Sequence, residues 1–429
     1  MTSIKPFNTF IFKNYHFDQK SKTLELTYGF DETYSFTESY VFDFPYVDYD
    51  HSSLDRALQN LFFMAGVSYY KAYPSSTIRI DHGKLDAKSA QFFSNVYQKG
   101  LGEYFYVNKL DPKTEVPFIA NTGSPITAND TDGEGILIGI GGGKDSLVSV
   151  ELLRDQPRVA SWSLGHRSQL QPLIDTIGLT HFWVDRHIDP LLLERNKLDA
   201  LNGHIPISAI FACTGTVVAI LSGYKDVVVS NESSANEPTL EYQGVSINHQ
   251  YSKSLAFEKD YQELLQNHFG DSSRYYSLLR QFSEVKIAEM FAQCGFETYK
   301  DVFSSCNRAF VQSSNSMSWC GKCSKCAFTY LALSSFVEPA QLDKLWGKNL
   351  LLDTALHSTY NELLGIDGNK PLDCVGEIKE SRQAMRLTQN KYPSLSVFQF
   401  KLPDSYDYES LAEHSIPQDI YASVFPNSY

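Results

Sequence analysis

The amino-acid sequence predicts an α/β protein built on a doubly wound parallel sheet, with an N-terminal α+β domain and a helical C-terminal region. Two patterns lead to this fold class. Aromatic-rich, strand-like segments come first, and from Ile136 onward short apolar strands alternate with helical segments. The chain has 429 residues, of which 42% are hydrophobic, so it can bury sizeable cores. Its length corresponds to two or three domains of about 150 residues.

Charge and composition exclude several classes of function. Lys and Arg total 37 and Asp and Glu total 50, which gives a net charge of −13 and disfavours general binding to nucleic acids. The sequence has neither an apolar run long enough to span a membrane nor the pattern of a secretory signal. Seven cysteines, an odd number, favour a reducing compartment over a disulfide framework. We therefore expect a cytoplasmic protein with no nucleic-acid partner and no membrane partner.

Residues 1–115 are expected to form the α+β domain. The segments TFIFKNYHF, TLELTY and SYVFDF alternate apolar and polar positions, which is typical of half-buried antiparallel strands. A helical segment, SLDRALQNLFFMAGVSYYKAY, follows them, and a second helix is expected over Lys84–Lys99. Residues 116–134, rich in Pro, Gly, Asn, Asp and Thr, are predicted to be a linker.

Residues 135–300 are expected to form the parallel-sheet domain. Its strands are ILIGI, VASWSL, THFWVD and DVVVS, with helices over Asp145–Arg154, after Pro206 and along residues 252–295. Ligands of such sheets bind at the carboxyl ends of the strands. Residues 301–429 are expected to hold a four-cysteine metal site and a helical C-terminal region.

A glycine-rich loop, GIGGGKDS at Gly139–Ser146, follows the first of these strands and opens a helix. Backbone N–H groups and the helix dipole favour an anion at this position. Ser146 adds a hydroxyl donor and Lys144 a cation, while Asp145 can bind Mg²⁺ or cap the helix. The loop fits neither a Walker A motif nor a dinucleotide-binding fingerprint. The candidate phosphate-binding residues are Gly141, Gly142, Gly143, Lys144, Asp145 and Ser146, and a turn without a ligand is the alternative.

This loop resembles the SGGxDS pyrophosphate loop of the ATP pyrophosphatases, the PP-loop superfamily. The resemblance implies a doubly wound sheet of PP-loop type, ATP and Mg²⁺ as cofactors, and cleavage of ATP to AMP and pyrophosphate. Gly141 stands where serine is usual, so one phosphate donor of the superfamily pattern is missing.

Four of the cysteines form a cluster with the spacing C-x13-C-x2-C-x2-C. These are Cys306, Cys320, Cys323 and Cys326. Four thiolates suit a closed, structural Zn²⁺ site, whereas an iron–sulfur cluster and free buried thiols are the alternatives. The other three, Cys213, Cys294 and Cys374, are expected to be core thiols.

A polar segment of about thirty residues begins after the strand DVVVS, at the carboxyl edge of the predicted sheet and beside the glycine loop. Polar loops of this length often carry function, and a solvated surface loop is the alternative. The polar residues of the segment are Asn231, Glu232, Ser233, Asn236, His249, Tyr251 and Lys253.

The combination of GGGKDS, SNESSANE, NHQYSKS and CGKCSKCAF resembles one family, the UDP-N-acetylmuramoyl-L-alanyl-L-glutamate epimerases of bacterial peptidoglycan precursor synthesis. The similarity extends from about residue 130 to 380 and includes KPLDCVGE. It implies an ATP- and Mg²⁺-dependent enzyme that inverts the terminal L-Glu of a UDP-muramoyl dipeptide through an acyl-adenylate. The N-terminal domain would then bind the UDP-sugar portion of this small-molecule substrate.

Inversion needs proton-transfer groups that reach both faces of the α-carbon. Under this resemblance, His249 is the first candidate base, Lys253 is a second base or a phosphate clamp, and Glu232 binds metal or the substrate amine. His204 and His166 are further candidates. A 7-cyano-7-deazaguanine synthase-like ligase and a non-enzymatic nucleotide-binding protein remain alternatives.

Overall fold

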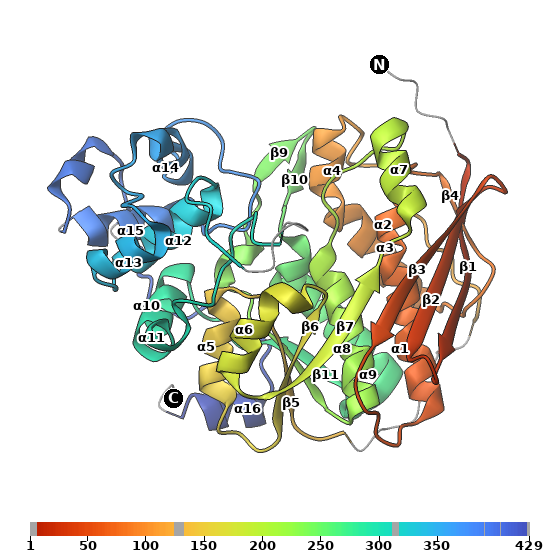
Figure 1. The fold of residues 1–429 in the computed structure, drawn as a ribbon. Coiled ribbons are helices and arrows are strands. Elements are labelled where there is room, and N and C mark those ends of the chain that lie inside the picture. Colours follow the sequence, from red (N-terminus) through yellow and green to blue (C-terminus); the bar gives the residue numbers. More distant parts are fainter. Residues whose placement is uncertain (1–6, 124–132, 311–316, 390, 404, 427–429) are drawn as a thin grey trace.

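A computed structural model describes residues 7–123, 133–310, 317–389, 391–403 and 405–426. Its centre is one nine-stranded sheet, coloured from red through green across Figure 1. In spatial order the strands are β11 (Arg274–Ser277), β8 (Asp226–Val229), β5 (Ile136–Gly139), β6 (Val159–Leu164), β7 (Thr180–His187), β3 (Tyr34–Phe42), β2 (Thr23–Phe30), β1 (Thr9–Asp18) and β4 (Thr77–Ile80).

The sheet has a parallel part and an antiparallel part. Strands β11, β8, β5, β6 and β7 run parallel to one another, which confirms the predicted parallel sheet. Strands β1, β2 and β3 pair antiparallel, as their alternating sequences predict. The two parts join where β3 pairs antiparallel with β7, with Val41 opposite Asp185. The sheet is therefore continuous across the predicted boundary at residue 115.

Helices cover both faces of the parallel part, as a doubly wound sheet requires (Figure 1). Along β5, Leu137 belongs to one buried core, and Ile136 and Ile138 belong to another, because successive side chains point to opposite faces. The first core includes helices α1 (His51–Ala65) and α8 (Ile207–Ser222). The second includes α5 (Lys144–Leu153), α6 (Arg167–Ile177) and α10 (Glu284–Cys294).

The remaining helices lie around this sheet and in the C-terminal region. Before the glycine loop they are α2 (Val67–Tyr70), α3 (Ala87–Gly100) and α4 (Gly102–Val107). After it come α7 (Pro190–Leu198), α9 (Leu255–Phe269), α11 (Phe296–Tyr299), α12 (Ser324–Ser334), α13 (Pro339–Trp346), α14 (His357–Leu363), α15 (Ile378–Gln389) and α16 (Gln418–Val424). Helices α12 to α15 form the predicted helical C-terminal region, drawn in blue in Figure 1. Helix α3 begins three residues after the expected Lys84, because the Asp86 carboxylate caps it by accepting from the Ser89 N–H.

One segment differs from the expectation. Residues 252–295 were expected to be helical throughout, but Arg274–Ser277 forms β11 between α9 and α10. This short strand is defined by its pairing with β8, in which Tyr276 lies opposite Val228, and a four-residue segment carries no periodicity of its own. In the predicted linker, residues 124–132 lie outside the described residues. No helix of the described residues is long and apolar enough to cross a membrane.

Candidate active site

The glycine loop lies at the carboxyl end of β5, directly before α5. Gly142 has a φ of +91°, and a Cβ there would lie 2.8 Å from Met317 Sδ, so glycine is required at this position. A Cβ on Gly141 would meet no atom of the described residues within 4 Å, so among these residues the loop has room in front of it. Gly143 is the N-cap of α5 and supplies no capping side chain, while Ser146 Oγ donates to its carbonyl oxygen at 3.1 Å. The loop has the open backbone expected of an anion site.

Carboxylates surround the lysine of this loop. Lys144 is only 4% exposed, and its ammonium contacts the carboxylates of Asp145 and Glu284. Burial works to lower the pKa of Lys144, but these two carboxylates raise it above its ordinary value, so the cation persists. Burial also raises the pKa of Glu284 to about 7, with contributions from the charges of Asp145 and Glu232. Oxygen ligands of this kind suit Mg²⁺, and the sequence alone had pointed only to Asp145 and Glu232.

The polar segment begins at the end of β8, which pairs parallel with β5, so its predicted position beside the glycine loop is confirmed. Ser149 Oγ of α5 lies 2.7 Å from Ser230 Oγ. The segment is more ordered than a plain loop, because it contains short elements of its own. They are η1 (Ser233–Asn236), the hairpin β9 (Leu240–Tyr242) and β10 (Val245–Ile247), and η2 (Tyr251–Lys253).

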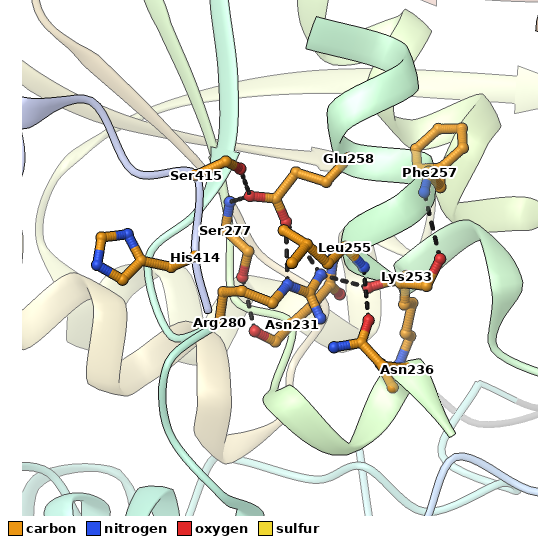
Figure 2. Close-up of polar contacts among 12 residues, drawn as sticks. Asn231, Asn236, Lys253, Leu255, Phe257, Glu258, Ser277, Arg280, His414 and Ser415 are labelled. Carbon is orange, nitrogen blue, oxygen red and sulfur yellow. Dashed lines mark hydrogen bonds and ion pairs between the residues drawn. The ribbon is translucent and has the colours of Figure 1, made fainter. Parts of the chain in front are cut away.

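A buried arginine fixes the two ends of this segment (Figure 2). Arg280 is fully buried, and its guanidinium donates to the backbone carbonyls of Glu232, at 2.5 Å, and Lys253. It also pairs with the buried carboxylate of Glu258, at 3.0 Å. The second oxygen of Glu258 accepts from the Ser277 N–H at 3.1 Å. Arg280 therefore places two predicted site residues, and no sequence pattern had singled it out.

His249 lies at the centre of a second polar cluster. Its Nδ1 is hydrogen-bonded to Glu103 Oε2, and its Nε2 lies 3.8 Å from Cys374 Sγ. His204 Nδ1 lies 3.9 Å from the same Glu103 oxygen, and the two imidazole rings are 4.3 Å apart. Burial lowers the pKa of His249, but Cys374 and Glu103 more than reverse this and raise it to about 9. Burial and the His249 charge lower the pKa of His204 to about 4.

Lys253 connects the two clusters electrostatically. Burial lowers its pKa, but the charges of Cys374, Glu232, Asp145 and Glu284 raise it above the ordinary value. Its ammonium therefore lies among the thiol and the loop carboxylates. A raised pKa favours the role of a cationic clamp over that of a base at neutral pH.

The predicted cysteine cluster is assembled in the structure. Cys306 Sγ lies 3.8 Å from Cys323 Sγ, and Cys320 Sγ lies 3.8 Å from Cys326 Sγ. All four sulfur atoms are within 4.8 Å of one another. A Zn–S bond of about 2.3 Å gives a tetrahedron with edges of about 3.8 Å, so these residues fit a tetrahedral metal ion. Gly321, with a φ of +62°, provides the turn between the second and third cysteine.

The remaining candidates are distributed differently. Cys213 is a core thiol as expected, whereas Cys294 is exposed and Cys374 is part of the His249 cluster, so the expectation was wrong for these two. The residues around Cys374 are far away from it in the sequence, and it does not lie on an apolar helix face. His166 lies apart from this cluster, at the N-cap of α6, with its ring 4.3 Å from that of Phe310.

Four residues of the candidate site were not predicted from the sequence: Glu103, Arg280, Glu284 and Cys374. A signal was present for Cys374, because it lies within the motif KPLDCVGE. Glu103, Arg280 and Glu284 belong to helical or turn segments without a distinctive motif, and only tertiary packing brings them to the site.

Fold and site together define an α/β protein with a glycine-rich loop and ionisable side chains at the carboxyl edge of a parallel sheet, next to a four-cysteine cluster. Residues 1–278 match the family model of the MurL N-terminal domain, and residues 302–397 match that of the MurL C-terminal domain. The chain belongs to the family of UDP-N-acetyl-alpha-D-muramoyl-L-alanyl-L-glutamate epimerases, which confirms the resemblance seen in the motifs.

Three curated relatives carry that name. The protein of Salinispora tropica is 40% identical over 348 residues, which are 80% of this chain and 75% of the relative. The protein of a Micromonospora species is 38% identical over 346 residues, 80% of this chain and 77% of the relative. The protein of Xanthomonas oryzae pv. oryzae is 36% identical over 393 residues, which are 90% of this chain and 86% of the relative. No solved structure matches the chain.

Proposed function

We propose that this protein is an ATP-dependent epimerase that inverts the terminal L-Glu of UDP-MurNAc-L-Ala-L-Glu to D-Glu through an acyl-adenylate, releasing AMP and pyrophosphate. The observation that carries the proposal is the position of the glycine loop and of His249 and Lys253 around one edge of the sheet. The names of the relatives support the reaction and its small-molecule substrate. The proposed location is the bacterial cytoplasm, with neither nucleic acid nor a membrane as partner.

Activation explains why an epimerase would need a phosphate-binding loop. A free carboxylate resists loss of the α-proton, because the product would carry two negative charges on one enediolate. An acyl-adenylate lacks the carboxylate charge, so its α-proton is more acidic. In this proposal the loop is a PP-loop, in which the N–H groups of Gly141–Gly143 and the Ser146 hydroxyl hold the pyrophosphate.

Mg²⁺ would be held by the carboxylates beside the loop, where it would neutralise phosphate charge. The acidic set of Asp145, Glu232 and Glu284 supports this role, because Mg²⁺ prefers oxygen ligands. Lys253 is proposed to clamp the phosphate or the acyl carboxyl group as a cation. His249, whose pKa is raised to about 9, enters the reaction in its protonated form at neutral pH.

Zn²⁺ is the proposed ion of the four-cysteine cluster. Four sulfur ligands leave no open coordination position, so the ion would hold the surrounding chain together and take no part in the chemistry. The 3.8 Å separations of the Cys306–Cys323 and Cys320–Cys326 sulfur pairs support this proposal.

The test is to incubate the purified protein with ATP, Mg²⁺ and UDP-MurNAc-L-Ala-L-Glu in D₂O. We expect AMP, pyrophosphate and D-Glu with deuterium at the α-carbon. Asp145→Asn should lower AMP formation by a factor of about 100 or more, because a ligand for the phosphate-bound ion is lost. Asp155→Asn, an exposed position just after α5, is the matched control and should leave the rate unchanged.

Two results would contradict the proposal. AMP formation only with a different acid would indicate another adenylating enzyme. Absence of ATP turnover with this substrate and with other acids would indicate a nucleotide-binding protein without this activity.

A further inference from the structure

Cys374 is the end of a hydrogen-bonded chain of three side chains that are far apart in sequence. Glu103 of α4 is bonded to His249 Nδ1, and His249 Nε2 lies 3.8 Å from Cys374 Sγ. A carboxylate that orients an imidazole, which in turn contacts a thiol, is an arrangement that activates cysteine. His249 is 9% and Glu103 15% exposed, so the chain is largely shielded from water.

The charges around this chain favour a thiolate. Burial raises the pKa of Cys374, but Lys253, His249 and Lys325 lower it to about 6. The pKa of His249, raised to about 9, lies above that of its partner. His204, whose ring lies 4.3 Å from that of His249, is neutral because its pKa is lowered to about 4. Near neutral pH the pair is therefore a thiolate beside an imidazolium, and the only one of the two that can accept a proton is the thiolate.

The thiol is also held at a defined place. The carboxylate of the preceding residue, Asp373, accepts from Asn307 Nδ2 at 2.9 Å and from Ser324 Oγ. Asn307 follows Cys306 and Ser324 follows Cys323, so two parts of the cysteine cluster hold the segment that carries Cys374. The charges of both Cys374 and Asp145 of the glycine loop act on the ammonium of Lys253, so this lysine links the thiol electrostatically to the loop.

We propose that Cys374 is a catalytic residue, a thiolate base that takes the α-proton of the activated glutamyl group while Glu103 and His249 hold it in place. The proposal rests on the proposed function and names a proton-transfer group of the same site. The Cα–H bond breaks, the proton moves to Sγ, and the electron pair passes into the activated acyl group as an enolate. An acid on the opposite face then protonates the α-carbon, and the thiol returns its proton to solvent. In this scheme His249 is a positioning residue, whose Nε2–H donates a hydrogen bond to the thiolate and keeps its proton.

The first experiment separates activation from proton transfer. In Cys374→Ala and Cys374→Ser, substrate-dependent exchange of pyrophosphate into ATP should persist within about threefold, while deuterium incorporation at the α-carbon should fall about 100-fold or more. Cys294→Ser, at an exposed cysteine outside the site, is the control and should match the wild type in both assays. Deuterium incorporation by Cys374→Ala at the wild-type rate would overturn the proposal. A wild-type protein that forms no AMP contradicts the proposed function instead.

The second experiment needs no turnover. Alkylation of Cys374 by iodoacetamide, followed by peptide mass mapping across pH, should show a midpoint near 6 in the wild type. His249→Ala should move that midpoint upward, because the imidazolium is lost. A wild-type midpoint near the ordinary thiol value of about 8.5 would overturn the proposal. So would a hydroxylamine-sensitive acyl group on Cys374 after incubation with ATP and substrate, because the thiolate would then be a nucleophile and not a base.

Discussion

At the scale of single residues, Arg280 links parts of the site that are distant in sequence. One planar guanidinium serves the carbonyls of Glu232 and Lys253 and the carboxylate of Glu258 together. A lysine has no such fork and could not reach the three acceptors in these directions. The position of Lys253 relative to the glycine loop therefore depends on a residue that itself touches neither ATP nor substrate in the proposed reaction.

Replacing Arg280 by methionine should lower the free energy of unfolding by about 3–5 kcal/mol, because Glu258 is left as a buried charge without its partner. Urea denaturation measures this change. Lys259→Met, in α9 next to Glu258, removes an ion pair with Glu413 that is exposed on both sides, and should cost about 1 kcal/mol or less. Equal losses of stability in the two variants would contradict the role of Arg280.

The site residues that the sequence could predict are those that lie close together along the chain. The glycine loop occupies consecutive positions, and the cysteines are recognisable by their short spacing. Glu103 and Cys374 could not be found in this way, because they lie 146 and 125 positions from His249 and meet it only through tertiary packing. The charge state of His249 could not be predicted from the sequence either, because its raised pKa depends on these two neighbours.

At the scale of elements, the cysteine cluster lies at the N-terminal end of α12 and connects it to other segments. Cys323 is the N-cap of this helix, Cys326 lies in its first turn, and Cys306 comes from the segment after α11. Because Asp373 bonds to residues next to Cys306 and Cys323, the loop before α15 is tied to the same cluster. A metal ion would therefore stabilise several segments at once.

Cys323→Ser should abolish metal binding and lower the melting temperature and soluble yield, because a structural zinc ion contributes directly to folding. We expect about one zinc ion per chain in the wild type and close to none in the variant, measured by elemental analysis of protein purified without chelators. Cys294→Ser is the matched control and should keep its metal. A wild-type protein that carries iron, or no metal, would contradict the zinc proposal.

The elements that the sequence predicted well are the long or strongly apolar ones. The strand ILIGI, the helix after Pro206 and the alternating strands at the N-terminus all have a clear period or an apolar run. Strand β11 could not be predicted, because four residues fix no period and its identity depends on β8 beside it.

At the scale of the whole molecule, the first 115 residues and the parallel sheet share one core. Residues of β1, β2 and β3 belong to the same buried cluster as Leu137, Trp162 and Val227 of the parallel strands. Arg186 of β7 pairs with the fully buried Glu38 of β3 at 2.7 Å. The predicted domain boundaries remain a prediction, but this shared core makes independent folding of the two parts unfavourable.

Separate production of residues 1–123 and 133–429 should therefore give insoluble or unfolded pieces, because each would expose half of the shared apolar core and one half of the buried ion pair. Soluble yield and circular dichroism measure this outcome. Co-expression of the two pieces is the control and should restore a soluble complex. A stable, folded fragment of residues 1–123 would show that the N-terminal part is an independent domain.

The order of the strands has one more consequence. The two outermost strands, β11 and β4, each have only four residues, whereas β1, β2, β3 and β7 inside the sheet have eight to ten. A short outer strand gives a neighbouring molecule few unpaired backbone groups to which it could add a strand of its own. The long strands, which would be the better templates for such edge-to-edge association, each have a partner strand on both sides within the same chain, although β4 covers β1 only over Thr9–Phe12.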